Sequence, residues 1–169
     1  MTEIRPAKSK LWEPIIGDTF ESFLKFVKED RGIVDEHSIN IIKNNALNIL
    51  KRCVIEEDEN NLSKRTTLHL GEVQSGKTLT MCSVIALAYD NDFLISTILT
   101  GTKNILKAQN QDRIKEVLNA IDSGNTKFIY YSEPTENDQL KTQLKDLTKK
   151  KKFIDNKMIV FTMLKHQNS

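Results

Sequence analysis

The chain has 169 residues, of which 38% are hydrophobic and 28% are charged, with a formal net charge of +2. This length allows one globular unit with a core that needs no disulfides. No apolar run approaches the roughly 18 residues of a membrane span, and Met1–Pro6 lacks the apolar stretch of a signal peptide. We therefore expect a cytoplasmic protein, with Cys53 and Cys82 as free thiols.

The first part of the chain is predicted to be an irregular lead-in, anchored by Trp12, followed by a helix. Asp18 and Glu21 have the spacing of a capping box, in which each side chain bonds a backbone N–H at the helix start. The helix is expected to begin there, and Gly32 is expected to end it.

A second helix is predicted from Ser38 to about Val54, where apolar residues recur at helical spacing. These residues are Ile39, Ile42, Ala46, Ile49, Leu50 and Cys53. We expect residues 1–65 to form a helical lead-in packed on the remaining residues, 66–169.

From Thr66 onward, short β-rich runs alternate with amphipathic helices, which predicts an α/β fold with a parallel sheet. The expected strands are Thr66–Leu70, Phe93–Leu99, Phe128–Tyr131 and Met158–Met163. The expected helices are Gly76–Ala88, Asn104–Ile121 and Asn137–Thr148.

A phosphate-binding motif follows the first of these strands. The residues Gly71, Glu72, Val73, Gln74, Ser75, Gly76, Lys77 and Thr78 match G-x-x-x-x-G-K-[ST] at every fixed position. Glycines let successive N–H groups surround an anion, and the helix that follows adds the positive end of its dipole. We expect Lys77 to reach the β- and γ-phosphates of ATP, and the Thr78 hydroxyl to bind Mg²⁺.

Hydrolysis would also need a carboxylate on a later strand, and none is found in the expected pattern. The nearest run ends in Ser132-Glu133, with serine where aspartate is required. Asp35-Glu36-His37 precedes the phosphate loop and is expected to lead into the second helix. Asp155-Asn156-Lys157-Met158 lacks the aspartate of a guanine-binding motif, which favours ATP over GTP.

The stretch Leu99-Thr100-Gly101-Thr102-Lys103-Asn104-Ile105-Leu106-Lys107-Ala108-Gln109 resembles motif Ia of superfamily-two helicases, the DEAD/DEAH and type III restriction group. Leu106 and Gln109 match that motif, whereas its Pro-Thr-Arg start is absent. The longer run, over roughly residues 66 to 120, looks closer still to helicase-like ATPases that carry a Z-one domain, found beside bacterial restriction and defence enzymes. The shared residues are Val73 to Thr78, Gly101, Asn104, Leu106, Gln109, Gln111 and Arg113.

The resemblance implies that residues 66–169 are the first part of a RecA-like ATP-binding domain. The activity implied is that of a DNA helicase or translocase in a restriction-modification or defence system. On this view the sequence is an N-terminal fragment, inactive alone, because the Asp-Glu strand of such ATPases would follow Met158–Met163 in a missing C-terminal part of the same protein. The alternative is a P-loop ATPase that acts as a protein switch without nucleic acid.

Nucleic acid, DNA rather than RNA, is the partner that the resemblance implies for the segment after the second strand. The contacts expected are Gly101, Thr102, Lys103, Asn104, Lys107, Gln109 and Arg113. The charge of the chain fits, because residues 101–169 hold 12 Lys and 1 Arg against 8 acidic residues, which is +5. A β–α loop followed by a solvated helix face would contain similar residues. Lys149–Lys152 is predicted to be a solvated helix end.

Overall fold

A three-stranded parallel sheet forms the centre of the computed structural model, which describes residues 12–53, 76–100, 104–122, 124, 127–132, 141–142, 144–145 and 157–164. The strands are β1 (Ile95–Thr100), β2 (Phe128–Ser132) and β3 (Met158–Leu164), in the order β1-β3-β2. Ile95 pairs with Ile159, and Phe128 pairs with Met158. The predicted α/β fold with a parallel sheet is therefore confirmed.

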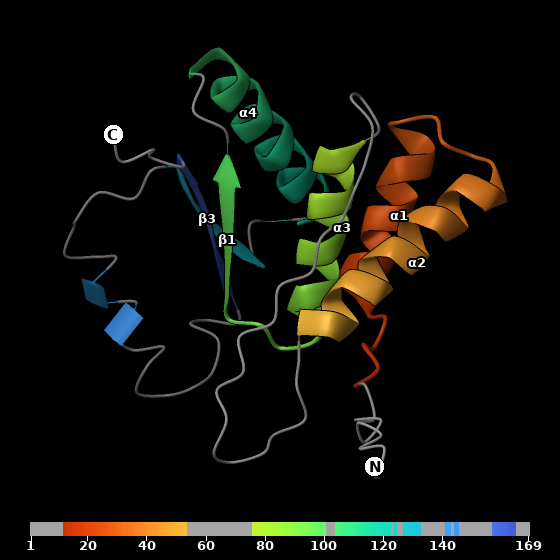
Figure 1. Ribbon diagram of the computed structural model, residues 1–169, viewed down its shortest axis with the longest axis horizontal. Helices are drawn as coiled ribbons and strands as arrows, with labels where there is room; N and C mark the ends of the chain where they lie inside the picture. The colour runs from red at the N-terminus through yellow and green to blue at the C-terminus, as the bar shows by residue number, and fades with distance from the viewer. Residues whose placement is uncertain are drawn as a thin grey trace, which may run out of the picture.

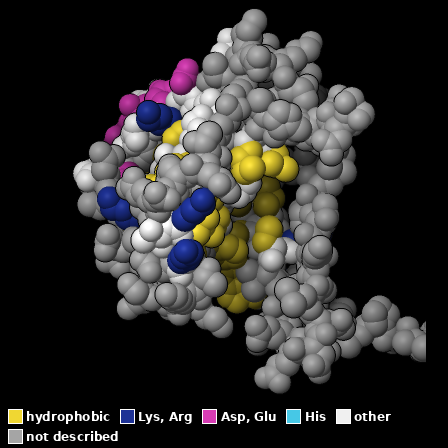
Figure 2. Space-filling view, turned by 90° about the vertical axis from the view of Figure 1, so that its left-hand side faces the viewer, with side chains coloured by type: hydrophobic (Ala, Val, Ile, Leu, Met, Phe, Trp, Pro, Cys, Tyr) yellow, Lys and Arg dark blue, Asp and Glu magenta, His cyan; other side chains and the backbone are white. Residues whose placement is uncertain are grey.

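The central strand β3 is buried from Met158 to Thr162, and all of these residues except Thr162 are apolar, as is usual where both faces of a parallel strand are covered. Met158 and Val160 belong to the large core cluster beneath the helices. Ile159 and Phe161 point to the opposite face, where Leu144 packs against them. Figure 2 views the molecule from the side of the sheet, where described hydrophobic side chains form a band with Lys and Arg beside it.

Four helices lie on one side of this sheet, with α1 and α2 packed on α3 (Figure 1). They are α1 (Asp18–Glu29), α2 (Glu36–Cys53), α3 (Lys77–Asp90) and α4 (Asn104–Ile121). The large core cluster takes residues from all four helices and from the sheet, so the lead-in helices share their core with the rest of the fold. Trp12 packs against this cluster, with its ring centroid 6.4 Å from that of Phe93, which confirms it as an anchor.

The predicted capping box at Asp18 and Glu21 is wrong. The N-cap of α1 is Gly17, and no side chain of the helix caps it. The cap is instead the carboxylate of Asp90 at the end of α3, which accepts the N–H groups of Gly17 (3.1 Å), Thr19 (3.1 Å) and Phe20 (2.8 Å). A Cβ at Gly17 would lie 2.7 Å from Asp90 Cγ, so glycine leaves room for this approach.

Asn91 continues the contact between the end of α3 and the entry to α1. Its Oδ1 accepts the N–H of Ile15 at 2.8 Å, and its Nδ2 donates to the Ile15 carbonyl at 2.7 Å. We call Asp90 and Asn91 the α3 clamp. The turn after it explains why β1 begins at Ile95 and not at the predicted Phe93, because the Phe93 N–H still bonds the Ala88 carbonyl.

The second helix begins two residues before the predicted Ser38. Asp35 caps it, since its carboxylate accepts the Ser38 N–H at 2.8 Å, and this bond lowers the pKa of Asp35. The role expected for Asp35-Glu36-His37, as a lead into this helix, is confirmed. The apolar stripe ends before its last predicted member, because Cys53 in the final turn is exposed.

The two cysteines should differ sharply toward a thiol reagent. Cys82 is 0% exposed, and burial raises the pKa of its thiol to about 12, so almost no thiolate exists near pH 8. Cys53 is exposed, although partial desolvation raises its pKa as well. We expect the folded protein to take up one equivalent of label, faster at higher pH, and a second equivalent only on unfolding. Equal labelling of both thiols in the native protein would contradict the packing of α3.

The helix α4 has the bounds predicted from its apolar stripe, and Ile114, Val117, Leu118 and Ile121 are all buried. Asp122 follows the last residue of α4, and its carboxylate accepts the N–H groups of Lys127 and Phe128 at 3.0 to 3.1 Å, which directs the chain into β2.

Beneath α4, Thr162 is 0% exposed and bonds the Tyr130 hydroxyl at 2.8 Å. Gln111 Nε2 donates to the same threonine at 3.3 Å, so Gln111 joins α4 to the sheet.

Several predicted elements lie outside the described residues. These are the strand Thr66–Leu70, the Lys149–Lys152 patch and most of the helix Asn137–Thr148, of which residues 141–142 and 144–145 are described and helical. Within the described ranges, no helix combines the length and apolar character needed to cross a membrane.

Candidate nucleotide-binding site

The beginning of α3 is the described part of the predicted phosphate loop. Gly71 to Ser75 lie outside the described residues, whereas Gly76, Lys77 and Thr78 are within them. Gly76 is the N-cap with φ 75° and ψ 22°, a left-handed conformation that favours glycine, and no side chain caps the helix. The first-turn N–H groups, which have no partner within a helix, are therefore not taken up by a capping side chain.

The charge around this helix start also suits an anion. No acidic residue occurs in the first turn of α3, so the positive end of the helix dipole is not offset there. Lys77 is exposed and Thr78 is half-buried. The Gly76 carbonyl accepts the Thr80 N–H at 3.0 Å, which begins the regular helix directly after the glycine.

A cavity of about 640 Å³ lies at this helix start. Its described lining comes from three places in the fold: the α1–α2 connection, the first turn of α3, and α4. The lining residues are Arg31, Ile33, Gly76, Lys77, Thr78, Leu79, Arg113 and Val117. Three of these eight residues are cationic, and none is acidic.

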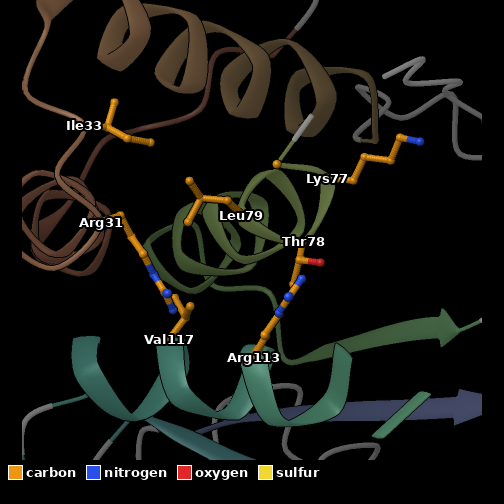
Figure 3. A pocket seen from close by; sticks show the side chains of 8 residues that line it. Arg31, Ile33, Lys77, Thr78, Leu79, Arg113 and Val117 are labelled. Atoms are coloured by element: carbon orange, nitrogen blue, oxygen red, sulfur yellow. The ribbon is translucent and has the colours of Figure 1, made fainter. Parts of the chain in front are cut away.

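Figure 3 shows how the side chains divide this cavity. Arg113 reaches from α4 toward Thr78, whereas Arg31 reaches toward Val117 on the other side. Lys77 stands at the edge and extends away from Arg113. It also lines a second cavity of about 350 Å³, between α3 and β1. Because its side chain is exposed and has rotatable bonds, Lys77 can turn toward a bound phosphate.

The residues expected to contact nucleic acid are only partly described. Gly101, Thr102 and Lys103 lie outside the described residues, as do the side chains of Asn104 and Lys107 within α4. Gln109 and Arg113 are exposed. Arg113 also lines the cavity and points toward Thr78, the residue predicted to bind Mg²⁺.

Arg31 and Ile33 were not anticipated from the sequence, where they stand in a short connection more than 40 residues before Gly76. Arg31 pairs with Glu116 on α4 (Nη2 to Oε2, 3.0 Å), and its Cζ lies over the Phe26 ring, 5.2 Å from the centroid. No motif in the sequence marks either residue, and the ion pair that fixes Arg31 beside the cavity comes from α4.

In comparisons with known proteins, no protein-family model, curated protein or solved structure matches the chain.

Proposed function

We propose that this chain binds Mg·ATP in the cavity at the start of α3 and serves as the ATP-binding part of a DNA helicase or translocase of a bacterial restriction or defence system. The observation that carries the proposal is an uncapped helix N-terminus at which Lys77 and Thr78 begin α3 and toward which Arg113 reaches from α4. Backbone N–H groups, a helix dipole and cations together are the means by which proteins hold phosphates. We also propose that the parallel sheet belongs to a RecA-like domain.

The residues present fit a magnesium ion that accompanies the nucleotide. The Thr78 hydroxyl lines the cavity and offers one neutral oxygen, the type of ligand that Mg²⁺ prefers. Phosphate oxygens and water would complete the octahedral shell. When bound, the ion would neutralise part of the phosphate charge, and Lys77 and Arg113 would offset more of it.

The nucleic-acid part of the proposal can be tested separately from nucleotide binding. Binding of single-stranded DNA should weaken steeply as the salt concentration rises. The logarithm of the binding constant should fall linearly with the logarithm of the salt concentration, with a slope of about −0.7 per neutralised phosphate. Replacing Lys103 and Lys107 with alanine should reduce this slope by about 1.4. Arg113 is left in place, because it lines the nucleotide cavity. The measurement is a fluorescence-anisotropy titration at several salt concentrations.

The matched control is the double alanine variant of Lys150 and Lys151, which removes the same charge from the same half of the chain. It should change the slope less. If this control loses as much as the first variant, attraction to DNA is diffuse and the proposed path after β1 is wrong. Mg·ATP binding without any DNA binding would favour the protein-switch alternative.

A further inference from the structure

The cavity has an apolar side that phosphate binding does not use. Ile33, Leu79 and Val117 line it together with Arg31. At the start of α3, Arg113 reaches toward Thr78, and Lys77 stands at the edge of the cavity (Figure 3). A nucleotide has the same division, with a flat apolar base at one end and charged phosphates at the other. Ligand sites of about 300 to 1,000 Å³ are usual for small molecules, and this cavity is within that range.

The guanidinium of Arg31 is held in place from two directions. Glu116 on α4 pairs with Nη2 at 3.0 Å, and the nearly buried Phe26 ring lies beneath Cζ at 5.2 Å. A guanidinium is planar, and its broad faces stack on aromatic rings. Because Arg31 is held over the Phe26 ring and also lines the cavity, its guanidinium is placed where it can stack on a flat group bound there.

We propose that Arg31 is the stacking platform for the adenine base of the bound nucleotide, and that Ile33, Leu79 and Val117 form the apolar wall around it. This assignment rests on the proposed binding of Mg·ATP. It gives the lead-in helices a direct part in binding, because Arg31 and Ile33 belong to the connection between α1 and α2. On this assignment, residues of the lead-in contact the base, and residues of α3 and α4 contact the phosphates.

The test uses Arg31→Lys and two probes, Mg·ATP and magnesium tripolyphosphate, in calorimetric titrations of the full chain. Lysine keeps the positive charge but has no planar face. We expect Arg31→Lys to weaken ATP binding about tenfold, as the loss of one stacked base does, while tripolyphosphate binds as it does to the wild type. Arg52→Lys, an exposed conservative change on α2, should alter neither affinity.

A second variant, Glu116→Gln, tests the same assignment in case Arg31→Lys does not fold. Glu116→Gln keeps the guanidinium but removes the charge that holds it, and its exposed ion pair contributes little to stability. Its ATP affinity should fall by less than that of Arg31→Lys, again without a change for tripolyphosphate.

Three results would overturn the assignment. Equal ATP affinity of wild type and Arg31→Lys would remove Arg31 from the base site while leaving Mg·ATP binding intact. An equal loss for ATP and tripolyphosphate would mean that Arg31 acts on the phosphates. If the wild type binds neither probe, the proposed function itself is wrong, and the base platform falls with it.

Discussion

Replacing Lys77 with alanine should weaken Mg·ATP binding by about 100-fold or more, measured by calorimetric titration. Lys77 is the cation at the first residue of α3, and a hydrogen bond from a charged group contributes up to about 3 kcal/mol. The fold should be unaffected, because the side chain is exposed and alanine is a good helix former. The melting temperature of the variant should therefore match that of the wild type.

The matched control for this experiment is Lys28→Ala, which removes one exposed lysine from α1, outside the described lining of the cavity. It should bind Mg·ATP like the wild type and thereby separate a local effect from a change in net charge. Equal affinities for wild type and Lys77→Ala would contradict the assignment of the phosphate site.

Replacing Asp90 with alanine should lower the free energy of unfolding by about 3 kcal/mol. The change removes three charge-assisted hydrogen bonds to the N-terminus of α1, from the N–H groups of Gly17, Thr19 and Phe20. Because α1 buries Phe20, Phe23 and Val27 completely, a poorly fixed α1 also loosens the core. The expected fall in melting temperature is roughly 10 °C for a protein of this size.

The control for Asp90 is Asp112→Ala, which removes an exposed carboxylate from α4. Its unfolding free energy should lie within about 0.5 kcal/mol of the wild type. Asp90→Asn keeps one acceptor oxygen and should fall between wild type and Asp90→Ala. If Asp90→Ala melts at the same temperature as the wild type, the Asp90 part of the α3 clamp makes no contribution to stability.

The features predicted well from the sequence are those set by neighbouring residues. The bounds of α4 follow from Ile114, Val117, Leu118 and Ile121, which share one face at helical spacing and are buried together. The start of α3 follows from Gly76, where the motif requires a glycine and the backbone has a positive φ. Local patterns of this kind determine helices and turns directly.

The features that were missed depend on residues far apart in the chain. Asp18 and Glu21 have the capping-box spacing, yet Asp90, about 70 residues later, supplies the cap. Arg31 lies beside the cavity, where it pairs with Glu116 of α4, far along the chain. Neither contact has a signature in the neighbouring sequence, since both arise only when α1, α3 and α4 pack together.

The position of α3 also links ligand binding to the folding of the lead-in. Its first residues line the cavity, while Asp90 at its last residue holds the start of α1. All three of α1, α3 and α4 enter one hydrophobic cluster, so none can unfold without exposing the others. A ligand that binds only the folded cavity would therefore raise the unfolding free energy of α1 as well. The predicted boundary at residue 65 thus lies between helices that share one hydrophobic core.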